Sequence, residues 1–140
     1  MNTPPVRALT VEQPWASCIA YATKRVINQH EPTDYRGLLL LHAGHRIDHR
    51  AWALPLARPL LRRPLSTSAV IAIGRLDDCH IDDGFCTLWS ARDRWHWRLT
   101  DVVALAKPVP WPGGTGALWA PPAPLLTNPR IAEALEAARA

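Results

Sequence analysis

The chain has 140 residues, of which 48% are hydrophobic and 20% are charged, and its formal net charge is +4 with the six histidines counted as neutral. This composition excludes a disordered chain, and the length suits one folded domain over residues 1–140. The mild positive charge is compatible with a polyanionic partner but does not require one. No apolar run is long enough to span a membrane, so we expect a soluble protein.

The cysteine content indicates a reducing compartment. The chain has three cysteines, Cys18, Cys79 and Cys86, and no secretory signal precedes them. Because disulfides are rare in the cytosol and an odd count leaves one thiol without a partner, we expect reduced thiols and a cytoplasmic protein. The sequence indicates no oligomeric state.

The first half of the chain predicts short strands around one helix. Leu9 and Val11 alternate with polar neighbours, which is typical of a strand, and we expect this strand over Arg7–Val11. Pro14 has no N–H and a fixed φ, so it suits the first turn of a helix predicted over Pro14–Ala22. We expect two further strands, at Val26–Asn28 and Gly37–Leu41, and then a turn over His42–Ile47.

The second half predicts longer strands and a final helix. Asp48 is expected to cap a helix that Pro55 and Pro59 break or kink. Ala69–Leu76 is rich in Val and Ile and predicts a strand, whereas Asp77–Arg94 predicts a polar, irregular connection. Strands outnumber helices and do not alternate with them, which favours an α+β fold, a small mixed β-barrel with flanking helices. The last two expected elements are a strand over Trp95–Leu105 and a helix from Pro129 capped by Asn128.

Two motifs near the N-terminus resemble one known family. They are Thr10-x-x-Gln13-Pro14-Trp15-Ala16-Ser17 and Tyr35-Arg36-Gly37, with Lys24 between them. At this separation they resemble the ASCH domain of the PUA-like superfamily. The resemblance implies a pseudo-barrel whose helices flank a cleft, and a nucleic acid as partner, with RNA favoured over DNA. It continues through Val70–Asp78, Trp95–Asp101 and Gly116–Trp119, and so covers most of the chain.

Lys24 is the residue on which the resemblance bears most directly. In PUA-like relatives a lysine after the first helix lies in the cleft, and in a bacterial enzyme that deacetylates N4-acetylcytidine the lysine at the matching place is catalytic. The threonine that this enzyme has three positions later corresponds here to Ile27, which has no hydroxyl. A crowded lysine can act as base or nucleophile, whereas a charged one would hold a phosphate. The alternative is an exposed lysine at a helix end.

A second group of candidate ligand-binding residues surrounds the same motifs. Trp15 and Tyr35 offer flat faces on which bases can stack, and Arg36 can hold a phosphate in a bidentate manner. Gln13 adds an amide. The structural alternative places Trp15 in the core and pairs Arg36 with an acid near a turn.

A third group lies in the predicted strand from Trp95. Basic and aromatic residues interleave here, which suits single-stranded nucleic acid, with Arg94, His96 and Trp97 as the candidates. The same period of two also has a plainer interpretation, in which Trp97 points inward while His96 and Arg98 lie on a solvated face.

Histidines and cysteines recur, but their spacing does not define a metal site. No C-x-x-C pair occurs. His42 ends a predicted strand and His49 lies in a predicted helix, so the side chains of the group that also includes His45 need not converge. We therefore predict no metal and no cofactor. The two groups are His42, His45 and His49, and Cys79, His80 and Cys86.

The sequence thus predicts an ASCH domain that binds nucleic acid in a cleft lined by Lys24, Arg36 and aromatic residues. One alternative is a hydrolase in which Lys24 is catalytic, either a ribonuclease or an enzyme resembling the N4-acetylcytidine amidohydrolase. Four acids are candidates for its partner: Asp77, Asp78, Asp82 and Asp83. A second alternative is a protein-interaction module in which the basic segment Arg58–Arg63 contacts an acidic partner.

Overall fold

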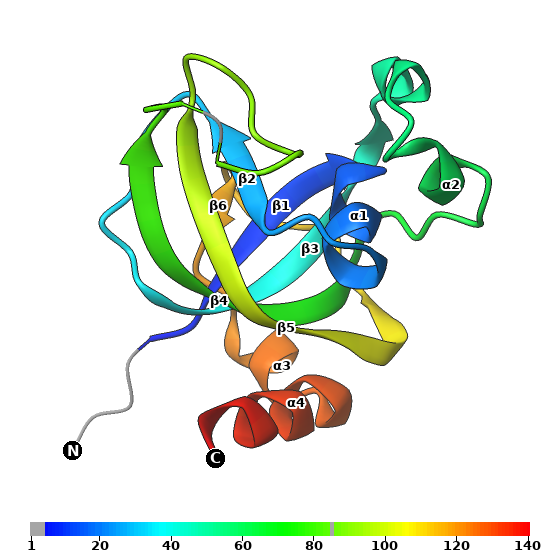
Figure 1. Ribbon diagram of the computed structural model, residues 1–140. Coiled ribbons are helices and arrows are strands. Elements are labelled where there is room, and N and C mark those ends of the chain that lie inside the picture. The colour runs from blue at the N-terminus through cyan, green and yellow to red at the C-terminus, as the bar shows by residue number, and fades with distance from the viewer. Residues whose placement is uncertain (1–4, 85) are drawn as a thin grey trace.

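The computed structural model describes residues 5–84 and 86–140, and within them the chain forms a mixed α+β fold, as the sequence predicted. One six-stranded sheet curls into a half-barrel with the strand order β2-β5-β4-β3-β1-β6 (Figure 1). The strands are β1 (Arg7–Gln13), β2 (Val26–Gln29), β3 (Gly37–Ile47), β4 (Ala69–Ile81), β5 (Trp95–Pro110) and β6 (Leu118–Trp119). The helices are α1 (Trp15–Tyr21), a 3-10 helix η1 (His49–Ala53), α2 (Arg58–Leu61), α3 (Ala123–Leu126) and α4 (Pro129–Arg139).

The long strands extend beyond their predicted ends. The turn predicted over His42–Ile47 is wrong, because these residues continue β3 and pair with both β1 and the start of β4. The irregular connection predicted from Asp77 is also wrong in its first part, because β4 continues to Ile81 opposite Trp95 of β5. In both places backbone pairing across the sheet keeps polar residues in a strand, although their local sequence pattern predicts a loop.

The curl of the sheet follows from irregular pairing between its two longest strands. The register of β4 against β5 shifts three times, between Val70 and Ala72, between Ile73 and Arg75, and between Leu76 and Asp78. Each shift of this kind bends a strand and increases its twist. β1 pairs in parallel with β3, and the other neighbouring strands are antiparallel. The bent hairpin therefore wraps around the space that α1 fills.

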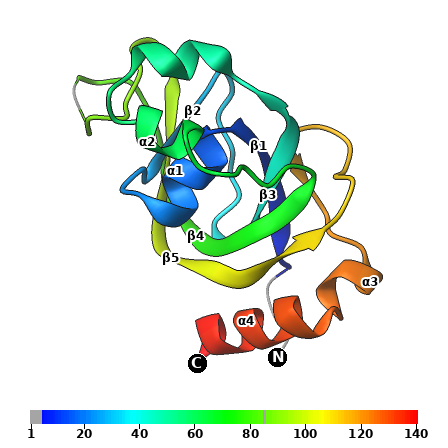
Figure 2. The same ribbon diagram turned by 90° about the vertical axis from the view of Figure 1, so that its right-hand side faces the viewer.

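The core lies on both faces of the sheet. Leu39 and Leu41 belong to the cluster inside the curl, where α1 packs against the strands (Figure 2). Leu38 and Leu40 belong to the cluster on the other face, beneath α3 and α4. The four consecutive leucines are at most 8% exposed, so the prediction that both faces are covered is confirmed. Alternation along a strand sends successive side chains to opposite faces.

The two predicted helix caps are confirmed, although one helix differs in type. Asn128 accepts a hydrogen bond from the Arg130 backbone N–H (3.0 Å) at the start of α4. Asp48 accepts one from the Arg50 backbone N–H (3.1 Å), but the segment it caps is the short η1. Pro55 follows η1 within two residues and cannot continue it. None of the described helices is both long and apolar enough to cross a membrane.

Gln13 fixes the angle at which the chain leaves β1 and enters α1. Its side chain is fully buried. The side-chain Oε1 accepts a hydrogen bond from the Ser17 backbone N–H (2.9 Å), and Nε2 donates to the Ser66 carbonyl (2.7 Å). One amide thus ties the first turn of α1 to the segment that precedes β4.

Gln13→Ala is expected to lower the free energy of unfolding by about 1–3 kcal/mol, because it leaves the buried Ser17 N–H and the partly buried Ser66 carbonyl without partners. Urea unfolding followed by tryptophan fluorescence measures this loss. Gln29→Ala, at the partly exposed end of β2, is the matched control and should change stability by less than about 0.5 kcal/mol. Equal stabilities of the two variants would contradict the role assigned to Gln13.

Candidate functional site

A cleft of about 750 Å³ opens beside α1. One wall consists of residues from η1 and the turn after it, among them Leu54 and Leu56. The opposite wall is the segment 88–91, part of the connection between β4 and β5, which runs past β2 toward α1 (Figure 1). Both walls present apolar side chains, since Leu54, Leu56 and Leu88 are 48%, 41% and 71% exposed. Concave sites of this size with a few polar groups are typical of ligand binding.

Lys24 occupies the cleft between two tryptophans. Its side chain is only 5% exposed, and its Nζ lies 5.6 Å from the ring centroid of Trp15 and 5.6 Å from that of Trp89. An ammonium at this distance from an indole gains a cation–π attraction, which is stronger where water is excluded. The two rings therefore stabilise a lysine that has few polar neighbours.

Burial changes the protonation of Lys24. It lowers the pKa of the ammonium to about 8, and a small opposing effect comes from Cys18 beside it. The same burial raises the pKa of the Cys18 thiol to about 11, so this thiol stays protonated and inert. None of the ion pairs formed within the described ranges includes Lys24. A lysine with this pKa is charged at neutral pH and is also readily deprotonated.

The first tryptophan is held by an acid at the mouth of the cleft. Trp15 Nε1 donates to Asp48 Oδ2 (3.1 Å), and the same carboxylate pairs with the Arg50 guanidinium, whose Nε lies 2.9 Å from Oδ1. The hydrogen bonds from Arg50 are the main cause of a lowered pKa of Asp48. The Arg50 side chain is 89% exposed and lines the cleft, so a cation stands at its rim.

The second tryptophan is held by an amide on β2. Asn28 Nδ2 donates to the Trp89 carbonyl (2.9 Å), and Asn28 Oδ1 accepts from the Ala91 backbone N–H (2.9 Å). The Trp89 Nε1 donates to Thr23 Oγ1 (3.2 Å). These three bonds fix the second wall to the strand and loop on either side of Lys24.

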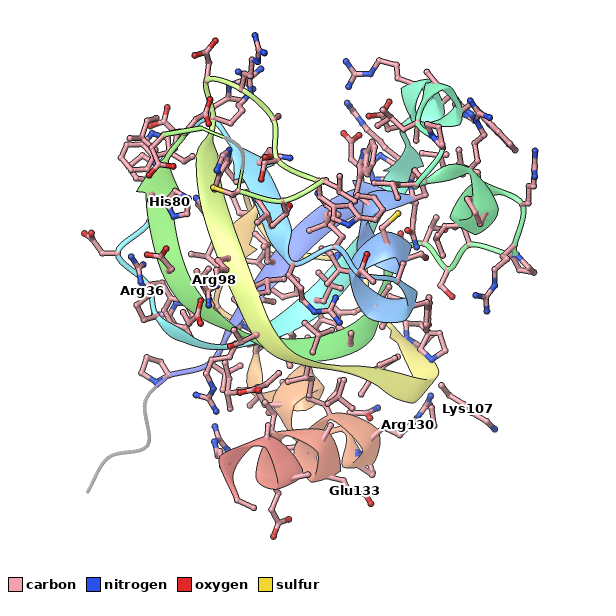
Figure 3. All side chains as sticks on the ribbon, in the orientation of Figure 1. Arg36, His80, Arg98, Lys107, Arg130 and Glu133 are labelled. Atoms are coloured by element: carbon pink, nitrogen blue, oxygen red, sulfur yellow. The ribbon has the colours of Figure 1, made fainter. Side chains whose placement is uncertain are left out.

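The structure brings two of the residues predicted from the motifs together and separates the others. Trp15 and Lys24 both line the cleft, whereas Gln13 holds α1 from within the core. Tyr35 is outside the cleft and donates from its hydroxyl to the Leu38 carbonyl (2.6 Å). Arg36 lies beside β4, on the side away from α1 (Figure 3), and Nη1 donates to the carbonyls of Thr33 and Tyr35 rather than to an acid.

The third group of predicted residues is largely covered. The expectation that His96 faces solvent is wrong, because residues 86–94 fold back over that face and leave His96 fully buried. His96 Nε2 donates to the Ala91 carbonyl (2.8 Å). Trp97 is 5% exposed and points inward as the plainer interpretation predicted, with Nε1 donating to the Glu31 carbonyl (3.0 Å). Arg94 is partly buried and does not line the cleft.

The acids that line the cleft differ from those proposed as partners of Lys24. Glu12 and Asp48 are among the lining residues. The four acids between Asp77 and Asp83 are not among those that line this cleft in the described part of the chain. Sequence analysis also missed Trp89, for which the available signal was a large aromatic residue within an otherwise polar segment.

Comparison with known proteins leaves the family open. No protein-family model matches the chain, and no curated protein matches its sequence. The class that fold and site define is therefore an α+β protein with a curled six-stranded sheet and a lysine held between two tryptophans in a cleft.

Lys24→Met is expected to raise the free energy of unfolding at pH 7 by about 1–3 kcal/mol, because it removes an ammonium whose burial is unfavourable. The folded pKa of about 8 is below the ordinary value of 10.5. The cost of the charge is therefore fully present below pH 8 and disappears as the pH rises toward 10.5. Urea unfolding at pH 7 and pH 10 should show the advantage of Lys24→Met shrinking at pH 10. Lys107→Met, on the exposed part of β5, is the control and should show no such pH dependence.

Proposed function

We propose that the protein is an ASCH domain of the PUA-like superfamily and that its cleft binds single-stranded nucleic acid, RNA in preference to DNA. The observation that carries the proposal is the position of Lys24 Nζ, 5.6 Å from both Trp15 and Trp89 in a cleft of about 750 Å³. The curled sheet with α1 at the edge of a cleft and the lysine after that helix supports the assignment, since both features agree with the resemblance at Gln13–Ser17.

In the proposed complex one unpaired nucleotide occupies the cleft. Its base stacks on an indole face of Trp15 or Trp89, and Lys24 donates to an oxygen or nitrogen on the edge of the base. Stacking on an aromatic side chain contributes about 1–3 kcal/mol per base. The exposed guanidinium of Arg50 at the rim contacts the phosphate of the same or the next nucleotide.

The preference for RNA rests on the resemblance and on how proteins read unpaired bases. A base must leave its stack before it can enter a site of this depth, and RNA loops, bulges and ends present such bases. A duplex cannot place a paired base against the indole face of Trp15 or Trp89 in this cleft, so we assign single strands as the ligand.

Lys24→Met and Trp89→Ala are each expected to weaken binding of a mixed-sequence single-stranded RNA by about 5- to 150-fold, since each removes a contact of roughly 1–3 kcal/mol. Fluorescence anisotropy of a labelled oligonucleotide measures the dissociation constant. Lys107→Met removes an equal charge far from the cleft and is the matched control. Equal effects of Lys24→Met and Lys107→Met would show non-specific attraction and would reject the cleft as the site.

The pKa of Lys24 supports a second candidate, a hydrolase of RNA or of an acylated nucleoside. A lysine with a pKa of about 8 can accept a proton near neutral pH and so serve as a general base. Attack of the activated water on an N-acyl group would break the carbon–nitrogen bond and yield a carboxylate and the free amine. Ile27 beside Lys24 in the cleft supplies no hydroxyl to assist.

The two candidates are separated by mass spectrometry of an RNA oligonucleotide containing N4-acetylcytidine after incubation with the protein. Binding alone leaves its mass unchanged, which is the result we expect. Loss of the acetyl group, or cleavage of the strand, that is absent with Lys24→Met and retained with Lys107→Met would instead identify the hydrolase.

A further inference from the structure

Three side chains that can ligate a metal converge outside the cleft. His80 comes from the end of β4, His96 from the paired position on β5, and Cys86 from the connection between these strands (Figure 3 labels His80). The Cys86 Sγ lies 3.1 Å from His80 Nε2 and 3.2 Å from His96 Nδ1. All three donor atoms lie within 4.8 Å of one another. They are contributed by segments that only the fold brings together.

In each imidazole, the nitrogen that faces away from Cys86 already has a hydrogen-bond partner. His80 Nδ1 lies 2.8 Å from Asp78 Oδ2, and His96 Nε2 lies 2.8 Å from the Ala91 carbonyl oxygen. Both partners are acceptors, so these two nitrogens carry the protons in the neutral rings. His80 Nε2 and His96 Nδ1 are then unprotonated, and both lone pairs face the same sulfur.

With both rings neutral, one thiol proton is available to the two nitrogens that face Cys86 Sγ. A thiol has a single proton and can donate it to one of the two nitrogens. The other nitrogen then faces a sulfur lone pair at about the same distance, at a triangle that is exposed on its His80 and Cys86 side and buried on its His96 side. A cation at the centre of the triangle satisfies all three atoms at once, because each of them then donates an electron pair to it.

We propose that Cys86, His80 and His96 form a binding site for one zinc-class divalent cation. Thiolate and imidazole together are the ligands that Zn²⁺ prefers, and coordination deprotonates the thiol. Tetrahedral geometry with the usual bond lengths places sulfur and nitrogen about 3.5 Å apart. The two sulfur–nitrogen distances of 3.1 and 3.2 Å are close to this value, so little movement admits the ion.

The surroundings of the triangle match those of metal-binding histidines. A ligating imidazole usually donates its other N–H to a carboxylate or a carbonyl, which orients the ring and raises its basicity. Asp78 does this for His80, and Ala91 does it for His96. Asp83 Oδ1 lies 4.0 Å from Cys86 Sγ, so either this carboxylate or a water molecule completes four ligands.

The cation would fasten the connection between β4 and β5 to the strands beneath it. That connection also carries Trp89, and Ala91 binds both His96 and Asn28. Metal binding is therefore expected to order the second wall of the cleft. The metal site does not depend on what the cleft binds.

The test is titration of the metal-free protein with Co²⁺ as a spectroscopic probe, followed by displacement with Zn²⁺, in a reductant that has no thiol. We expect one equivalent to bind with the visible bands of four-coordinate cobalt and a thiolate-to-cobalt charge-transfer band. Cys86→Ser should abolish that band. Cys79→Ser is the matched control, since Cys79 neighbours His80 on β4 but packs against the inner core, and it should retain the band.

Thermal unfolding provides a second readout that does not depend on the thiol spectrum. Zn²⁺ should raise the Tm of the wild type and of His45→Ala. It should not change the Tm of His80→Ala or of His96→Ala. Asp78→Asn should weaken Zn²⁺ binding by about 10–100-fold, as expected for loss of a carboxylate that orients a ligand. Circular dichroism of each metal-free variant checks that it is folded.

Three results would overturn the proposal. The first is the absence of stoichiometric Co²⁺ binding at micromolar concentrations to folded wild type. The second is an identical spectrum for Cys86→Ser and Cys79→Ser. The third is alkylation of Cys86 by iodoacetamide at the same rate with and without Zn²⁺, which would describe a free thiol rather than a ligand.

Discussion

The structure depends on the way in which the connection between β4 and β5 folds back onto β2 and β5. Asn28 holds this segment through both atoms of its amide, one to the Trp89 carbonyl and one to the Ala91 N–H. His96 adds a third bond to the Ala91 carbonyl. The fold-back therefore creates the second wall of the cleft and buries the His96 imidazole in one step.

The buried charge of Lys24 is the second consequence of this arrangement. An ammonium that loses water must gain compensating contacts, and here the two indole faces supply them where no carboxylate pairs with it among the described residues. The compensation is partial, which is why the pKa decreases to about 8. A ligand that offers an acceptor to Lys24 would complete it. Such a contact would lower the free-energy cost of keeping Lys24 charged in the cleft.

The cleft and the Cys–His triangle are physically connected through Ala91. The Ala91 N–H donates to the side-chain amide of Asn28 on the cleft side, and the Ala91 carbonyl accepts from His96 on the other side. A change in the position of either bond must move the same peptide segment, because both bonds hold residues of one short connection. Order in the triangle and the position of Trp89 are therefore expected to vary together.

The sequence by itself determined those features that depend on local pattern. The burial of the four consecutive β3 leucines on both faces, the Asn128 cap and the strand from Ala69 follow from periodicity and backbone chemistry that act within a few residues. Trp15 and Lys24 could be identified because Trp15 belongs to one motif of the resemblance and Lys24 follows the helix that this motif begins. Only the tertiary structure decided that Trp89 lies against Lys24, 65 positions earlier in the chain, and that Cys86 lies between His80 and His96. Those contacts result from register shifts in a curled sheet and from one fold-back, and no local pattern of residues encodes where a strand pair bends or what its connection covers.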